Sequence, residues 1–203
     1  MAGWRRHEGQ AVRLPLANVD TDQLIPARFM SVPRAEGYGR YLLHDLRRDE
    51  SGVMRRDFPL NTVDQASVLV AGANFGSGSS REAAVYALVD AGFRVVFAPS
   101  FGDIFASNAV NNGLLPARID ADTSDALAEM LVGFPCKVQI DLGTCRATFG
   151  NHDVPFTLDE NWRIKLMNGW DDIDLTQQHA MAIDAFRERY AETSPWTVPR
   201  KRS

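Results

Sequence analysis

The 203-residue sequence contains few of the residues that form disulfides and metal sites, with only two cysteines and four histidines. Cys136 and Cys145 have no other cysteine or histidine nearby at metal-binding spacing, which is typical of thiols in a reducing compartment. Iron–sulfur clusters usually take more than two thiolates, so this chain cannot hold one unaided. The sequence therefore predicts no metal site and no cofactor site on this chain.

Long apolar runs and an excess of basic charge are also missing. The longest apolar run, residues 95–99, is far too short to span a membrane, and the first ten residues contain no apolar stretch suited to a secretory signal. The formal net charge is −4, from 22 basic and 26 acidic residues, and offers no attraction to nucleic acid or to an anionic membrane. We therefore expect a cytoplasmic protein that binds neither nucleic acid nor membranes.

The composition is that of an ordinary globular protein, with 45% hydrophobic and 24% charged residues. Between residues 66 and 119, short apolar runs alternate with amphipathic ones, which predicts an α/β fold with a central, mostly parallel sheet covered by helices. The expected strands are residues 67–71, 93–98 and 114–119, and the expected helices are residues 82–91 and 103–111. Further along, we expect a helix over 124–131, a hairpin over 136–149 and a strand over 154–158.

Three irregular or terminal segments complete the organisation of the chain. Residues 28–58 have little periodicity, and because such long segments are unusual unless functional, we interpret them as a mobile substrate loop. Near the C-terminus Thr176 can cap a helix, and four of its residues recur at a spacing that predicts one buried stripe: His179, Ile183, Phe186 and Tyr190. We expect a single domain over residues 1–194 and a flexible tail over 195–203.

The glycine-rich stretch of residues 72–82 carries the most functional information, because it joins an expected strand to an expected helix. Such a loop faces the crevice at the carboxyl ends of parallel strands, and the N-terminus of the following helix favours anions. Gly76 and Gly78 would permit positive φ angles, while residues 79–81 present two hydroxyls and a guanidinium. Spacing alone leaves two interpretations, an anion-binding site or a turn whose serines cap the helix.

Three common motifs are missing from this loop. A dinucleotide fingerprint needs a glycine where Arg81 stands, and a P-loop needs a lysine that the loop lacks. The nucleophile elbow Gly-x-Ser-x-Gly is missing as well. The sequence therefore supports neither of these nucleotide-binding motifs and does not support the elbow of a serine hydrolase.

Several motifs follow one another along the chain: residues 18–29 (NVDTDQLIPARF), 76–82 (GSGSSRE), 98–105 (APSFGDIF), 111–116 (NNGLLP), 167–173 (MNGWDDI) and 175–179 (LTQQH). In this order they resemble the small subunit of 3-isopropylmalate dehydratase, which is similar to the swivelling fourth domain of aconitase. The resemblance covers residues 12–190. It implies an aconitase-type swivelling β/β/α domain and a hydro-lyase that interconverts 2- and 3-isopropylmalate in leucine biosynthesis.

The resemblance also implies partners and roles for two residues. The partners are a large subunit that holds a [4Fe–4S] cluster and a substrate that is a small hydroxy-dicarboxylic acid. By analogy with aconitase, Ser79 is the base that takes a proton from the carbon next to a carboxylate. Arg81 corresponds to an arginine that binds substrate carboxylate, a role that suits its planar fork. The chain is then active only together with the large subunit.

Three more residues are interpreted as substrate-binding: Ser80, Arg28 and Asn74. Ser80 is expected to cap the helix and to donate toward an oxyanion. Arg28 is expected to contact a second carboxylate and Asn74 to orient the loop, although a solvated arginine and an ordinary turn residue fit them nearly as well. We interpret Asp20 and Asp22 as structural residues of a turn rather than as substrate ligands.

The identity of the substrate stays open at this stage. Phe29, Met30 and Val32 suggest an apolar pocket wall that suits a branched alkyl group, with Gly37 and Gly39 as hinges. Ala83 stands where many relatives have histidine. The alternatives are therefore a dehydratase of methylmalate, citramalate or homoaconitate type, or a non-catalytic module that binds anions.

Overall fold

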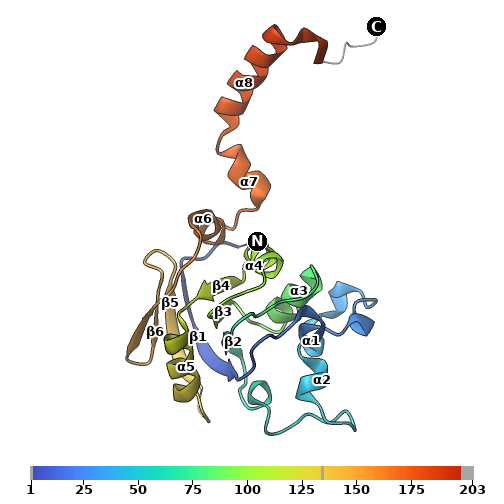
Figure 1. Ribbon diagram of the computed structural model, residues 1–203, viewed down its shortest axis with the longest axis vertical. Coiled ribbons are helices and arrows are strands. Elements are labelled where there is room, and N and C mark those ends of the chain that lie inside the picture. Colours follow the sequence, from blue (N-terminus) through green and yellow to red (C-terminus); the bar gives the residue numbers. More distant parts are fainter. Residues whose placement is uncertain (1, 134, 198–203) are drawn as a thin grey trace.

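The computed structural model describes residues 2–133 and 135–197, and a seven-stranded sheet in the order β4-β3-β2-β1-β5-β6-β7 lies at its centre (Figure 1). The strands are β1 Arg6–Leu14, β2 Ala66–Ala71, β3 Val95–Ala98, β4 Leu115–Arg118, β5 Cys136–Asp141, β6 Arg146–Phe149 and β7 His152–Pro155. Strands β1 to β4 are parallel to one another, and β5 to β7 extend the sheet in antiparallel fashion. This architecture confirms the predicted α/β class.

Helices lie on both faces of the sheet and along its edge. They are α1 Thr21–Leu24, α2 His44–Arg47, α3 Glu82–Asp90, α4 Asp103–Asn111, α5 Ala121–Met130, α6 Glu160–Asn168, α7 Asp172–Gln177 and α8 Ala180–Thr193. Short 3-10 turns are η1 Ala27–Phe29, η2 Arg34–Glu36, η3 Gly39–Tyr41, η4 Pro59–Asn61 and η5 Pro195–Thr197. Within the described part of the chain, no helix has the length and apolar character needed to span a membrane.

The alternation of side chains along the parallel strands creates two cores. In β2, Leu69 and Ala71 join the core beneath α1, α3 and α4, whereas Val68 and Val70 face the core beneath α5 and α6. Successive residues of a strand point to opposite faces, so a strand that is apolar on both faces has to be covered on both sides. The apolar runs over residues 66–98 therefore produce the central strands that their composition predicts.

Strand β1 has no counterpart among the predicted elements, although it lies in the middle of the sheet between β2 and β5. Its first half is polar and largely accessible, and only its second half is buried. Gly9 permits its close approach to β2, because a Cβ there would lie 1.9 Å from Ser67 Oγ. The tertiary position of β1, rather than its own hydrophobic pattern, makes it a strand.

Two elements have an end that differs by three residues from the sequence prediction. Helix α5 begins at Ala121 rather than near 124, because the Asp120 side chain accepts a hydrogen bond from Thr123 N at 2.8 Å and so caps an earlier turn. Strand β7 covers His152–Pro155 rather than residues 154–158, since it pairs with β6 immediately after the turn at Gly150. The hairpin of β5 and β6 lies where it was predicted.

The C-terminal arm, defined here as residues 171–197, projects away from the rest of the molecule (Figure 1). The predicted single helix with a buried stripe is wrong: α7 and α8 are separate helices and neither has a buried residue. Thr176 lies inside α7, and His179 occupies the N-cap position of α8. Helical spacing identifies an apolar face but does not determine what covers it. Of the expected flexible tail, residues 195–197 form η5 and the remainder lies outside the described residues.

Candidate active site

The glycine-rich loop after β2, residues 72–81, is held between the segments that follow β1 and β3 and is called the clamped loop below. On one side, Gly76 N donates to Val19 O at 2.7 Å, and Thr21 N donates to Ser77 O at 2.9 Å. On the other side, Phe75 N donates to Ser100 O at 3.0 Å, and Gly102 N donates to Phe75 O at 2.9 Å. Hydrogen bonds on both sides give this loop a defined shape at the carboxyl edge of the sheet, where α/β proteins bind ligands.

The two glycines in the middle of the loop adopt the backbone conformation that their positions predict. Gly76 has φ +72° and Gly78 has φ +94°, so both lie in the left-handed region that favours glycine. At Gly76 the space is also filled, because a Cβ would lie 2.2 Å from Cγ of Phe105. Both the backbone angle and the packing against α4 therefore require glycine at position 76.

Asn74 orients the beginning of the loop. Its backbone N–H donates to Ser100 Oγ at 2.8 Å, and its Nδ2 donates to Asn18 Oδ1 at 3.0 Å. Asn74 itself has φ +59°, a conformation that asparagine tolerates better than most residues. These contacts tie the segments after β1, β2 and β3 to one another. They agree with the predicted orienting role, while substrate binding by Asn74 stays a prediction.

Residues 79–81 form the accessible tip, where the loop turns into α3. Ser79 and Ser80 are exposed, and Arg81 N donates to Ser79 O at 2.8 Å. Arg81 occupies the N-cap position of α3, and no side chain caps this helix, so the expectation that Ser80 would cap it is wrong. Ser80 lies one residue too early in the chain for that contact. The first-turn N–H groups of α3 therefore receive no side-chain oxygen from the described residues.

Thr21 and Asp22 bring α1 against this tip. Thr21 Oγ1 donates to Ser79 O at 3.1 Å, and Asp22 forms an ion pair with Arg81, whose side chain is 23% exposed. Asp20 caps α1 by accepting from Gln23 N at 2.7 Å, which confirms its structural interpretation. Asp22 differs, because it contacts the candidate carboxylate-binding arginine. The sequence did contain a signal for Asp22. If the first aspartate of Asp-Thr-Asp caps a helix, the second lies on the exposed first turn, where its carboxylate is available to a neighbouring cation.

Arg28 lies on η1 and makes its contacts away from the clamped loop. Its guanidinium pairs with Asp45 through both terminal nitrogens, and it lies over the Phe29 ring at 4.6 Å. Hydrogen bonds from Arg28, and then from His44, lower the pKa of Asp45. The structure therefore brings Ser79, Arg81 and Asp22 together, but it gives Arg28 a partner of its own.

Residues 28–58 are anchored to the body at several points. Leu42 and Leu43 are fully buried, and the Tyr38 hydroxyl donates to Val32 O at 2.9 Å. Gly39 is not free to act as a hinge, because a Cβ there would lie 2.5 Å from Ala91 N at the end of α3. Gly37 has φ +81° and no atom within 4 Å of a Cβ built on it. Movement of this segment stays a prediction, and only Gly37 fits the expected hinge.

The described residues contain no group of three or more His, Cys, Asp or Glu side chains that could hold a metal ion. Both cysteines are free and half-buried, and burial raises the pKa of each thiol. Cys136 begins β5, whereas Cys145 lies in the turn between β5 and β6. This donor set does not fit an iron–sulfur cluster, which needs more deprotonated thiolates than these two residues can supply.

The chain is similar to known proteins along most of its length. It is 42% identical over 185 residues to the 3-isopropylmalate dehydratase small subunit of Shouchella clausii, with 90% of this chain and 94% of that protein covered. It is also 42% identical over 195 residues to the protein of the same name from Shewanella sp., with 93% and 97% covered. A crystal structure of 3-isopropylmalate dehydratase from Methanocaldococcus jannaschii superposes with a TM-score of 0.63 at 26% identity, covering 89% of this chain and 98% of that one.

Two family models match two separate parts of the chain. The model described as the aconitase C-terminal domain matches residues 1–122, which include the clamped loop and the Asp22–Arg81 pair. The model for the C-terminal domain of the 3-isopropylmalate dehydratase small subunit matches residues 172–200. Together with relatives of 42% identity over nine-tenths of the sequence, these matches place the chain in the family of 3-isopropylmalate dehydratase small subunits, which carry an aconitase-type domain.

Proposed function

We propose that this chain is the small subunit of a 3-isopropylmalate dehydratase, a hydro-lyase of leucine biosynthesis, and that it supplies Ser79 and Arg81 to an active site shared with a large subunit. The observation that carries the proposal is the clamped loop, which holds an exposed serine beside an arginine at the uncapped N-terminus of α3. The names of the relatives agree with this activity.

In this proposal Ser79 Oγ accepts the proton from the carbon adjacent to a substrate carboxylate. The C–H electron pair forms a double bond as hydroxide leaves the neighbouring carbon, and addition of water in the opposite sense gives the isomer. A serine oxygen is a useful base only if its negative charge is stabilised. The α3 N–H groups and the Arg81 guanidinium supply a positive field at this position.

In this proposal the departure of hydroxide is helped by a group outside this chain, since two cysteines are too few for an iron–sulfur cluster. In the proposal the large subunit holds the [4Fe–4S] cluster, which supplies Lewis-acid chemistry at the substrate hydroxyl. The task of this chain is then to hold the substrate carboxylate and to move the proton.

Arg81 is suited to the carboxylate. Its Nη1 contacts Asp22, while the guanidinium has five N–H donors in a planar fork. Asp22 thereby orients Arg81 and leaves donors for a substrate carboxylate. Arg81→Lys should raise KM and also lower kcat, because a bidentate contact becomes a single point charge.

The decisive experiment is Ser79→Ala in enzyme reconstituted with the large subunit. We expect kcat to fall by about 10² to 10⁴, the usual contribution of positioned proton transfer, with unfolding and subunit association unchanged. Ser51→Ala, at an exposed position on the 49–54 turn, is the matched control and should retain full turnover. Near-normal turnover of the Ser79 variant would remove the serine from the mechanism.

The substrate proposed is isopropylmalate, with a smaller methyl-substituted malate as the alternative. The Phe29 ring stacks on Tyr41 at 4.2 Å and lies under the Arg28 guanidinium, which is paired with Asp45, while Met30 is exposed. Phe29 and Met30 therefore offer apolar side chains beside a cation that already has a partner. A third substrate carboxylate would be costly to bury against such surface. Comparison of kcat/KM for isopropylmalate, citramalate and homocitrate tests this choice, and a preference for homocitrate would contradict it.

A further inference from the structure

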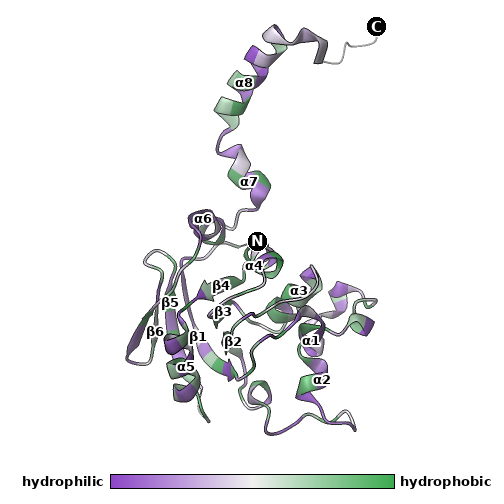
Figure 2. Cartoon of the chain, viewed as in Figure 1, coloured by the Kyte–Doolittle hydropathy of each residue, from purple (hydrophilic) through white to green (hydrophobic). Residues whose placement is uncertain are grey.

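The C-terminal arm exposes large apolar side chains that no described part of this chain covers. Ile183, Phe186 and Tyr190, called the arm stripe below, follow one another along α8 and are 38%, 54% and 44% exposed. The rings of Phe186 and Tyr190 stack at 5.6 Å. Apolar segments of the ribbon on α7 and α8 extend beyond the body (Figure 2). A cluster of this kind is unusual on a monomeric soluble protein and marks an interaction surface.

The angle between α7 and α8 adds a concave part to this surface. A hollow of about 410 Å³ lies there, and its lining includes Ile173, Ala180 and Ile183. Ile183 belongs to both the hollow and the arm stripe, so the two form one apolar surface. A partner with protruding apolar side chains fits such a surface better than a charged ligand does.

The base of the arm is held firmly. The buried Lys165 of α6 donates from Nζ to Asn111 Oδ1 at 2.5 Å and to Asp172 Oδ1 at 2.6 Å. Asp171 caps α7 by accepting from Asp174 N at 2.8 Å, and its own backbone N–H donates to Asp174 Oδ2 at 3.0 Å. The direction in which the arm leaves the body is therefore specified by side chains of the body and of α7.

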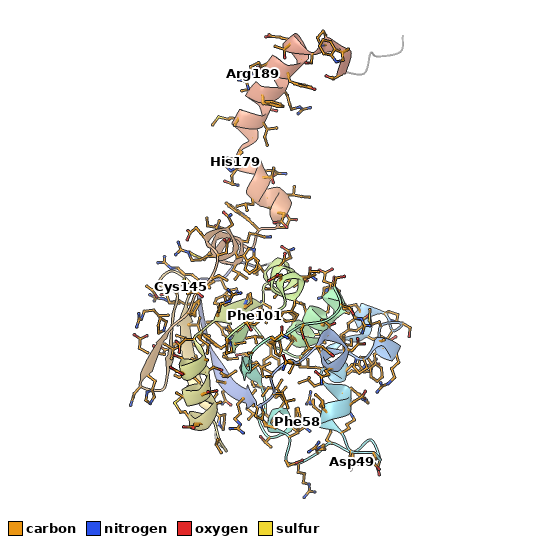
Figure 3. All side chains as sticks on the ribbon, viewed as in Figure 1. Asp49, Phe58, Phe101, Cys145, His179 and Arg189 are labelled. Carbon is orange, nitrogen blue, oxygen red and sulfur yellow. The ribbon has the colours of Figure 1, made fainter. Side chains whose placement is uncertain are left out.

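The arm also reaches far from the body. His179 and Arg189, which lie on the arm, are well separated from Phe101 beside the clamped loop (Figure 3). An element that is fixed at its base and extends away from its own fold can contact a second protein without disturbing the packing of the first. The arm therefore has the geometry of an interaction element.

We propose that the arm is the docking element by which this chain binds its large subunit, an inference that rests on the proposed function. The base of the arm adjoins the side of the sheet edge that carries the clamped loop. A cavity of about 630 Å³ is lined both by Phe101, which follows β3 and pairs with the clamped loop, and by Leu175 of α7. A large subunit that reaches Ser79 thus has a path along this cavity to the arm.

The match of the arm to a family model of its own agrees with this role. The aconitase-type model, named as the C-terminal domain of a longer enzyme, matches residues 1–122, whereas the arm matches a model named for the small subunit. A domain within one long chain needs no docking device, but a separate subunit does. Residues 172–200 are therefore the part of the sequence expected to hold the two subunits together in place of a peptide chain that joins two domains.

A second copy of this chain is a poorer occupant. Pairing two arm stripes would bury three half-exposed side chains on each helix, on the order of a few hundred Å² in total, whereas stable interfaces bury at least about 1,200 Å². Docking on the large subunit instead adds the stripe to an interface that a shared active site already requires. The area therefore favours the large subunit.

The test replaces the stripe and leaves the opposite face of α8 as its control. Phe186→Asp with Tyr190→Asp should raise the Kd for the large subunit about 100-fold in sedimentation or fluorescence titrations, since buried aromatic anchors dominate such interfaces. Glu188→Gln with Glu192→Gln, on the far side of the helix, should leave the Kd unchanged. At saturating large subunit, the stripe variant should recover the wild-type kcat.

The outcomes separate this inference from the proposed function. Ser79→Ala should bind normally without turnover, the reverse of the stripe variant. Wild-type affinity of the stripe variant would overturn the inference, as would a dimer of the isolated wild-type chain that the stripe substitutions convert to a monomer. If the wild-type pair binds but shows no turnover, the proposed function fails while the binding curves still decide the role of the arm.

Discussion

The clamped loop and the C-terminal arm are both accessible, but they are accessible for different reasons. The loop is held by backbone hydrogen bonds on two sides, with Phe75 and Gly76 buried at its centre and Ser79 and Ser80 exposed at its tip. The arm is anchored at its base, and neither of its helices has a buried residue. The tip of the loop is thus exposed on a segment that is fixed on both sides, whereas all of α8 is exposed beyond the anchored base of the arm.

This difference separates two kinds of functional surface. Catalytic groups need positions fixed by their own fold, because a small displacement costs much of the rate. A docking element needs apolar area that its own fold leaves uncovered. Substitutions at the exposed tip of the loop should therefore affect turnover, and those at its buried glycine should affect stability, whereas substitutions in the arm should affect association.

The largest effect on stability is expected from Gly76→Ala. The added Cβ would meet the Phe105 ring at 2.2 Å and would also hold a left-handed backbone at φ +72°, for a combined loss of about 2–5 kcal/mol. Gly52→Ala is the matched control, because Gly52 has φ +80° and open space around it, and it should lose only about 1–2 kcal/mol. Urea unfolding measures both values, and equal losses would mean that the contact with Phe105 is unimportant.

Asp22→Asn should affect turnover more than stability. Removing the charge loosens the orientation of Arg81, so we expect KM to rise about fivefold at most, while the free energy of unfolding changes by less than about 1 kcal/mol because the pair is partly exposed. The control is Asp45→Asn, which removes the partner of Arg28 instead. Steady-state kinetics of the reconstituted enzyme distinguish the two, and identical KM values for both variants would contradict a special role for Asp22.

A smaller effect should come from His7, which lies in the body on β1. Its Nε2 is 2.9 Å from Ser67 Oγ, and burial, followed by the charge of Arg94, lowers the pKa of His7 below the ordinary 6.5. The unfolded chain then binds this proton more readily than the folded chain does. The contribution of neutral His7 to the free energy of unfolding is therefore fully present above pH 6.5 and is lost as the pH falls through the lowered pKa. The decrease in Tm on acidification should be smaller in His7→Gln by roughly 1–2 °C. His179→Gln, on the exposed arm, is the control substitution.

The smallest effect on stability is expected from removing α8 altogether. Truncation after Gln178 keeps the contact of Asp172 with Lys165 but deletes a helix without buried residues. The free energy of unfolding of the body should change by no more than about 0.5 kcal/mol, as for other surface changes. If denaturant titrations showed that the truncated chain loses several kcal/mol of unfolding free energy, α8 would have to pack on the body. The arm would then not differ from the loop in the way proposed.

Much of the body was predictable because its signals are local. The alternation of apolar runs predicted β2, α3, β3, α4 and β4 within about two residues of their ends, and the glycines at 76 and 78 predicted the backbone angles of the loop. Strand β1 escaped prediction because only its second half is apolar. The partners of Arg28 and Arg81 are remote in sequence, so no local pattern paired Arg28 with Asp45 or Arg81 with Asp22.

Periodicity and the short-range preferences of the backbone were enough to specify the α/β class, the order of the elements from β2 to β4 and the glycines that shape the loop. Which face of each helix is covered depends instead on how the elements are arranged in space. The spacing of Ile183, Phe186 and Tyr190 is the same whether the stripe lies in a core or in solvent, and only the position of α8 outside the body distinguishes the two. Asp22 and Arg81 are 59 positions apart, and their pairing exists only because the segments after β1 and β2 meet at one edge of the sheet.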